Sequence, residues 1–140
     1  MCKNVVLAID LDDENSWSSA LPRAIELAHG GALHLVNVVP DFGYAVVGQY
    51  FDDGAESEML ENTRQRLHAF AEQHVPADIL SSCLIGHGPI HSEILRMAAG
   101  VEADLVVVVA HKPGIKDYLM GPTAAHVVRH AETSVLVIRN

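Results

Sequence analysis

The sequence is poor in cysteine and in basic residues. Its 140 residues include two cysteines, Cys2 and Cys83, and Lys and Arg together number 9 against 18 Asp and Glu. Without a CxxC spacing, the two cysteines predict free thiols in a reducing compartment rather than a disulfide framework. The formal net charge of −9 disfavours nucleic-acid backbones and anionic membranes as main partners.

Long apolar segments are absent as well. No stretch approaches the ~20 apolar residues that span a bilayer. The apolar start Val5–Asp10 is too short for the h-region and cleavage site of a secretory signal. We therefore expect a cytoplasmic protein that associates with neither membranes nor nucleic acid.

Three motifs that accompany common chemistries are also missing. The chain contains no GxxxxGK[ST] loop, no GxGxxG after its first apolar run and no GxSxG elbow. These absences exclude a P-loop, a Rossmann dinucleotide fingerprint and a serine-nucleophile elbow. Asp10 and Asp12 form a carboxylate pair, but no matching acid ends another apolar run. We therefore expect no catalytic residues and no enzyme.

The chain does contain five short runs rich in Val, Ile and Leu. They are Asn4–Asp10, Ala32–Val39, Asp78–Ile85, Ala103–Ala110 and Ser134–Arg139. The fourth run holds Leu105–Val109 without a polar break, which is typical of strands buried on both faces in a parallel sheet. A length of 140 residues fits one ordinary domain, so we expect a single domain over residues 1–140.

Helical patterns separate these runs. They cover Ser19–His29, Glu56–His74, Pro89–Ala99 and Pro122–Ala131. Pro22 predicts a helix that starts near Ser19 or kinks in its first turn. Gly88-Pro89 supplies a predicted N-cap and first helical residue. Strictly alternating strands and helices predict an α/β fold with a doubly wound five-stranded parallel sheet and helices on both faces.

The carboxyl ends of three runs are candidate ligand sites, because ligands of open α/β sheets bind there. These ends are Ala8-Ile9-Asp10, Asn37-Val38-Val39-Pro40 and Ala110–Gly114. The Asp10 carboxylate suits the two hydroxyl groups of a ribose. A turn-capping role beside Asp12 and Asp13 explains it equally well.

The start of the last helix is a second candidate feature. Gly121 permits close backbone approach, Thr123 offers a hydroxyl, and free N–H groups at a helix start attract phosphate. On the same helix His126 and His130 are spaced i, i+4, which allows a metal site. The pair lacks a neighbouring carboxylate or cysteine, so solvent-exposed histidines opposite the Val127/Val128 face are the favoured interpretation.

Together these segments resemble the universal stress proteins, in their short F/G-type branch, from about Lys3 to Asn140. The resemblance is carried by Val5–Asp10, Asn37–Pro40, Gly88-Pro89, Ala110–Thr123, and Val127–Ala131 followed by Ser134–Arg139. It implies an adenine-nucleotide alpha-hydrolase-like fold with strand order 3-2-1-4-5. It further implies a homodimeric stress-response regulator that binds ATP or AMP, with Mg²⁺ as an accompanying ion.

The resemblance also implies roles for individual residues. It implies adenine contacts from Ala8, Ile9 and Val38, and a ribose contact from Asp10. The implied phosphate contacts come from Ala110, Lys112, Gly121, Thr123 and Ala124, with Val109, His111 and Pro122 in the same segment.

One motif departs from the family pattern Gly-x-x-Gly-x9-Gly-(Ser/Thr). The first two glycines fall on Val109 and Lys112, the hydroxyl residue falls on Pro122, and the stretch before Gly121 is one residue shorter. A dimeric interaction module that recruits a protein partner or a transporter without nucleotide is therefore the alternative function. Weak ATP hydrolysis stays open as a third possibility.

The last apolar run, Ser134–Arg139, predicts the dimer contact. An apolar strand at a sheet edge favours aggregation when it is left unpaired. Antiparallel pairing with its own copy across a two-fold axis removes this edge. The alternative is an edge covered by the last helix or by a loop.

Overall fold

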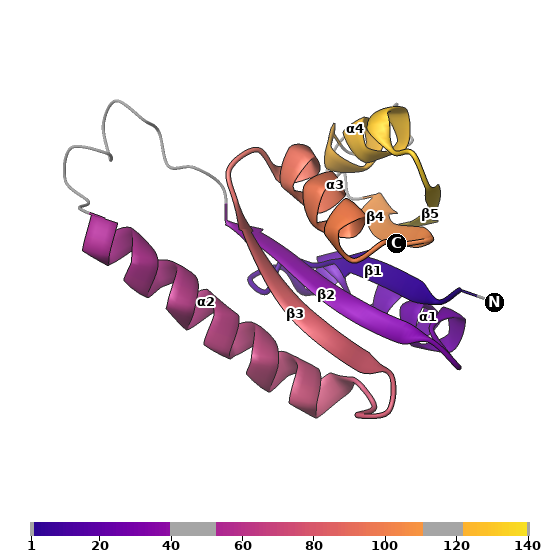
Figure 1. Cartoon of the computed structure of the whole chain (residues 1–140), viewed down its shortest axis with the longest axis horizontal. Helices are drawn as coiled ribbons and strands as arrows, with labels where there is room; N and C mark the ends of the chain where they lie inside the picture. The colour runs from indigo at the N-terminus through magenta and orange to yellow at the C-terminus, as the bar shows by residue number, and fades with distance from the viewer. Residues whose placement is uncertain (1, 40–52, 111–121, 140) are drawn as a thin grey trace.

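The computed structural model describes residues 2–39, 53–110 and 122–139, with the side chains of 53–56 excepted. Its centre is a parallel sheet of five strands in the order β3-β2-β1-β4-β5 (Figure 1). The strands are β1 (Asn4–Ala8), β2 (Ala32–Val39), β3 (Leu80–His87), β4 (Leu105–Ala110) and β5 (Ser134–Arg139). The predicted fold class and strand order are confirmed.

Four α-helices and a short 3-10 helix lie between the strands in the described parts of the chain. They are η1 (Glu14–Ser16), α1 (Ala20–Leu27), α2 (Asp53–His74), α3 (Ile90–Gly100) and α4 (Pro122–His130). In Figure 1, α2 runs along β3 at one edge of the sheet, while α3 and α4 lie side by side. Among the described residues, no helix combines the length and the apolar character needed to cross a membrane.

Strand β1 lies in the middle of the sheet and is buried on both faces. Leu7 is aligned with Leu35 of β2 and with Val107 of β4. It packs in a cluster with residues of α1 and α2, whereas Val6 packs in a cluster with residues of α3 and α4. Successive side chains of a strand point to opposite faces of the sheet. An unbroken apolar run therefore contributes to the hydrophobic core on both faces.

Helix α1 begins as the sequence predicts. Ser19 is its N-cap residue, and Pro22 is the third helical residue. The first four N–H groups of a helix have no intrahelical acceptor, so a proline in this turn removes no helical hydrogen bond. The start near Ser19 is therefore confirmed.

Several predicted boundaries differ from the structure by one to three residues, and two of these differences have a clear cause. Pro89 is the N-cap of α3 rather than its first residue, because its ψ of 125° is not helical. Strand β3 begins at Leu80 instead of Asp78. The N–H groups of Ile79 and Leu80 both bond to the Pro76 carbonyl, so a turn occupies the beginning of the apolar run.

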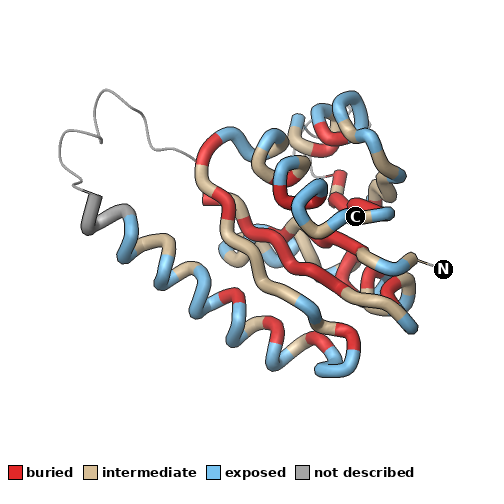
Figure 2. The backbone as a smooth tube through the Cα atoms, in the orientation of Figure 1, coloured by how far each residue is buried: buried red, intermediate tan, exposed pale blue. Residues whose placement is uncertain are grey.

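Helix α2 packs on the sheet mainly through its second half. Leu67 and Ala71 are fully buried there, and Phe70 makes an edge-to-face contact with Trp17 at 4.8 Å between ring centroids. From Ser57 to Arg66 the described side chains are exposed or half-buried (Figure 2). This part of α2 is available to line a cavity.

Candidate functional site

A cavity of about 610 Å³ opens at the carboxyl ends of β1, β2 and β4. The chain leaves β1 toward one face of the sheet and β4 toward the other, so the cavity lies at the point where the winding reverses. We call it the strand-end cavity. Its lining residues are Ala8, Ile9, Asp10, Leu11, Asp12, Asp13, Ser16, Val36, Asn37, Val38, Val39, Met59, Thr63, Arg66, Ile90, Ile94, Val108, Val109 and Thr123.

Asp10 follows β1 and organises the turn that begins there. Its backbone N–H donates to the Ser16 hydroxyl oxygen at 2.8 Å, and its carboxylate Oδ1 accepts the Asp12 N–H at 2.9 Å. The side chain is exposed and lines the cavity. Asp10 therefore caps the turn through one carboxylate oxygen, and within the described residues the other oxygen has no partner. The two roles predicted for this carboxylate are compatible.

Asn37 ties the end of β2 to the same turn. Its Oδ1 accepts the backbone N–H of Leu11 at 3.1 Å, and the side chain is only 7% exposed. A buried polar group is costly without a partner, and the Leu11 N–H supplies one for the amide oxygen. The hydrogen bond therefore fixes the turn after β1 against the end of β2.

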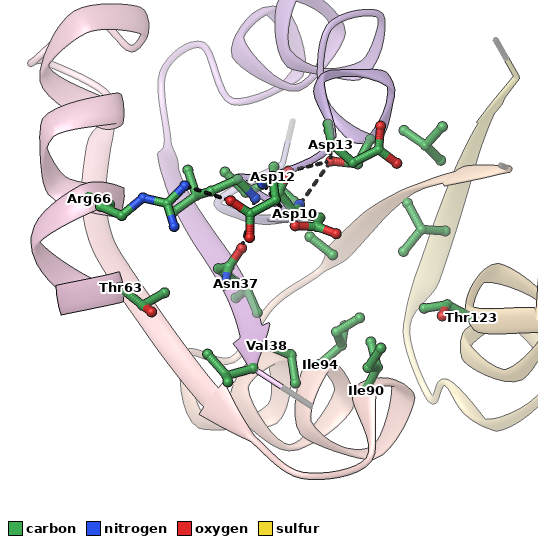
Figure 3. A pocket seen from close by; sticks show the side chains of 18 of the residues that line it. Asp10, Asp12, Asp13, Asn37, Val38, Thr63, Arg66, Ile90, Ile94 and Thr123 are labelled. Atoms are coloured by element: carbon green, nitrogen blue, oxygen red, sulfur yellow. Dashed lines mark hydrogen bonds and ion pairs between the residues drawn. The ribbon is translucent and has the colours of Figure 1, made fainter. Parts of the chain in front are cut away.

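Helix α2 contributes the wall that the sequence did not indicate. Met59, Thr63 and Arg66 follow one another at spacings of four and three residues, so they share a helix face. Arg66 donates to the Asp12 carboxylate at 2.8 Å across the cavity mouth (Figure 3). Both side chains are more than half exposed, so the pair contributes little to stability.

The start of α3 forms the floor through Ile90 and Ile94. Glu93 positions this helix start: its carboxylate accepts the His87 N–H at 3.1 Å and two N–H bonds from Arg96. The Arg96 guanidinium holds the pKa of Glu93 below its ordinary value; the His87 N–H adds to this effect, and burial opposes it. Glu93 is therefore an ionised positioning group beside the cavity.

The structure brings six of the predicted site residues to the cavity. They are Ala8, Ile9, Asp10, Val38, Val109 and Thr123. Ala110 and Ala124 are buried in the core, and Pro122 is exposed at the start of α4, so these three are not part of the lining. His111, Lys112 and Gly121 lie outside the described residues.

The residues that sequence reasoning missed come mainly from α2 and from the turn after Asp10. Thr63 lies one helical turn before the buried Leu67, yet it lines the cavity. Helical spacing predicts which residues share a helix face. It does not predict whether that face packs in the core or lines a cavity. Only the position of α2 beside β2 and β3 distinguishes them.

The histidines of α4 do face the same way, and His91 of α3 joins them. The His91 and His126 rings stack with centroids 4.5 Å apart and planes 20° apart, and the His126 and His130 rings are nearly parallel. In the described parts of the chain, no three His, Cys, Asp or Glu side chains are placed to hold a metal ion. His126 and His130 are exposed as expected, but Val128 is 43% exposed and is not part of a buried face.

Comparison with known proteins gives consistent matches along the whole chain. A model of the universal stress protein family matches residues 1–139. The chain is 25% identical to universal stress protein G of Escherichia coli O157:H7 over 142 residues, covering 99% of this chain and all of the relative. It is 31% identical over 144 residues to a universal stress protein of Thermus aquaticus named for the QAH/OAS sulfhydrylase 3′ region, with the same coverage.

Solved structures share the fold. A universal stress protein from Archaeoglobus fulgidus superposes with a TM-score of 0.64 at 21% identity, covering 97% of this chain and 93% of that one. UspA from Lactobacillus plantarum gives 0.66 at 23% identity, covering 98% and 97%. A universal stress protein solved in complex with cAMP gives 0.59 at 22% identity, covering 99% and 97%. The fold is that of the adenine-nucleotide alpha-hydrolase-like proteins.

Proposed function

Because the chain belongs to the universal stress protein family, we propose that it binds an adenine nucleotide, ATP or AMP, in the strand-end cavity. One observation carries the proposal: Asp10 after β1 and Thr123 at the start of α4 line the same cavity. Its volume of about 610 Å³ lies within the range of small-molecule sites. The related protein solved with cAMP supports an adenine nucleotide as the ligand class.

The lining offers a matching group for each part of such a ligand. Ala8, Val38 and Val108 provide apolar surface for the base, and the partner-free oxygen of Asp10 accepts a ribose hydroxyl hydrogen bond. The phosphates lie toward the start of α4, beside the Thr123 hydroxyl, where a helix favours anions. Lys112 and Gly121 complete the phosphate site in this proposal, and Mg²⁺ accompanies the triphosphate.

The proposed role is that of a cytoplasmic stress-response regulator without efficient catalysis. The missing nucleophile and P-loop motifs support a binding function. The two free cysteines are in keeping with a reducing compartment.

The proposal includes a homodimer formed through β5. This strand is at one edge of the sheet, and its Val135 and Val137 side chains are half-buried. Val128 on the neighbouring helix α4 adds exposed apolar surface. Pairing of two β5 strands would cover the edge.

Equilibrium dialysis against ATP, ADP and AMP tests the nucleotide proposal. We expect binding by the wild type and about ten-fold weaker binding by Asp10→Ala, the loss of one hydrogen bond to a charged group. Asp78→Ala is the matched control, because it removes an exposed carboxylate in the turn before β3, away from the cavity. Absence of binding at millimolar ligand would refute the proposal and favour the dimeric interaction module.

A further inference from the structure

Asn37 carries an amide group whose hydrogen-bonding capacity is only half used. The backbone N–H of Leu11 can only donate, so the amide atom 3.1 Å away must be the oxygen Oδ1. This assignment directs the amide nitrogen Nδ2 away from Leu11. Within residues 2–39, 53–110 and 122–139, Nδ2 has no hydrogen-bond acceptor, although Asn37 is only 7% exposed.

The open donor belongs to a residue that lines the cavity. Among the described residues no fully buried side-chain nitrogen or oxygen lacks a partner, so the unpaired Nδ2 keeps some accessible surface. Two other donors on this side already have acceptors: the Thr63 hydroxyl donates to the Met59 carbonyl, and one Arg66 nitrogen donates to Asp12. Asn37 therefore presents an unused N–H₂ group, on a largely buried residue that lines the cavity, to whatever fills it.

The order of polar groups across the cavity indicates which part of a nucleotide meets Asn37. In Figure 3, Thr123 lies on one side, Thr63 on the other, and Asp10 and Asn37 lie between them, with Asn37 next to the Thr63 side. If phosphates lie at the start of α4 and the ribose at Asp10, the base extends toward Asn37. The ring nitrogens of adenine that bear no hydrogen are acceptors, and they complement an amide donor.

We propose that Asn37 recognises the base of the bound nucleotide, with its Nδ2 donating a hydrogen bond to one ring nitrogen of adenine. This inference rests on the proposed nucleotide function and adds a specificity-determining residue to it. A ligand with a C–H group in place of that ring nitrogen leaves Nδ2 without an acceptor. A site with an unpaired polar group discriminates against such an analogue.

The test must separate this role from the positioning role that Asn37 has through Leu11. A loss of AMP affinity in an Asn37 variant alone is ambiguous, because the turn that holds Asp10 would also move. We therefore compare AMP with its 1-deaza, 3-deaza and 7-deaza analogues, each of which replaces one ring nitrogen by C–H. Isothermal titration calorimetry on the purified full-length chain gives the dissociation constants.

For the wild type we expect one of the three analogues to bind about three- to ten-fold more weakly than AMP, the loss of one neutral hydrogen bond. In Asn37→Leu this difference should disappear, whatever happens to the affinity for AMP itself. Asn37→Asp, measured at pH 8, keeps an oxygen for the Leu11 N–H and should also lose the difference. Asn62→Leu, an exposed site on α2 outside the cavity lining, should retain it.

Three results would overturn the inference while leaving nucleotide binding intact. In the first, the wild type binds all three deaza analogues as tightly as AMP. In the second, the weaker binding of one deaza analogue persists in both Asn37 variants. In the third, 2′-deoxy-AMP binds the wild type more weakly than AMP and this deficit disappears in both Asn37 variants, which would assign the amide to the ribose. A wild type that binds no AMP at all would refute the proposed function and this inference together.

Discussion

Asp104 and Lys3 are 101 positions apart in the chain and are joined by a 2.8 Å hydrogen bond from the Lys3 backbone N–H to the Asp104 carboxylate. The other carboxylate oxygen accepts the N–H of Asn4 at 3.0 Å. The carboxylate thus satisfies two backbone donors where β1 begins beside the turn that leads into β4. It ties the start of the chain to the middle of the sheet.

Acid should weaken the hydrogen bonds from Lys3 and Asn4 to the Asp104 carboxylate. The Lys3 N–H, followed by that of Asn4, lowers the pKa of Asp104. A lowered pKa in the folded state adds stability above the ordinary pKa, and this stability is lost as pH falls through the folded value. We expect Asp104→Asn to lower the free energy of unfolding by about 1 kcal/mol at pH 7 and by less below pH 3. Urea unfolding at both pH values measures the difference. An equal cost at both pH values would contradict the prediction; the exposed Asp78→Asn serves as control.

His34 should also make folding weaker in acid, but at higher pH than Asp104, in the range where histidine titrates. The ring is 5% exposed and bridges Ser82 at 2.6 Å and Asn4 at 3.0 Å. Because the contacted Asn4 atom is its oxygen, Nε2 carries the proton, and Nδ1 accepts from the Ser82 hydroxyl. Burial lowers the pKa of His34, so the folded protein keeps the ring neutral.

Stability should therefore be full above about pH 6.5 and should fall as pH drops below it, since the unfolded chain then binds the extra proton. His34→Leu leaves two polar partners unpaired and should cost about 1–3 kcal/mol at pH 7. Its unfolding free energy should decline less between pH 7 and 5 than that of the wild type. An unchanged decline in the variant would show that other groups cause it.

Gly31 and Gly100 should respond in opposite ways to alanine. A Cβ on Gly31 would meet the backbone of Cys2 and Lys3, with the Lys3 oxygen at 2.8 Å, while a Cβ on Gly100 would meet nothing within 4 Å. We expect Gly31→Ala to destabilise by about 1–3 kcal/mol and Gly100→Ala to stabilise by up to about 1 kcal/mol. Thermal unfolding followed by circular dichroism measures both, and similar shifts would refute the steric argument.

The β5 dimer can be tested by proline substitution. Val137→Pro removes a backbone donor from the edge strand, so the dimer should dissociate, whereas Val137→Thr keeps the N–H and should remain dimeric. Light scattering at micromolar concentration reads the mass directly. A monomeric wild type would show that the edge is covered in another way.

Lys112 lies outside the described residues, and its role stays a prediction from the sequence. A lysine in place of a phosphate-site glycine substitutes a mobile charge for backbone N–H contacts. Lys112→Glu should weaken ATP binding by about one to two orders of magnitude and leave adenosine binding nearly unchanged. Equal losses for both ligands would indicate damage to the fold, and Lys112→Gly provides the comparison with the family residue.

Much of the fold could be predicted because its signals are local. An unbroken run such as Leu105–Val109 belongs in a doubly covered strand wherever it lies in the chain. Pro22 marks a helix start because a proline is tolerated in the first turn. The apolar pattern did not predict where β3 begins, because the carbonyl of Pro76 accepts the N–H groups of Ile79 and Leu80.

The sequence by itself determined the layered architecture, the burial of β1 and the place of Asp10 at a strand end, because apolar periodicity and turn chemistry act over a few residues. Only the tertiary structure decided that Thr63 faces a cavity, that Asn37 meets Leu11, and that His91 stacks on His126. These relationships join segments distant in the chain. They depend on how the helices pack on the sheet, and local patterns carry no information about that.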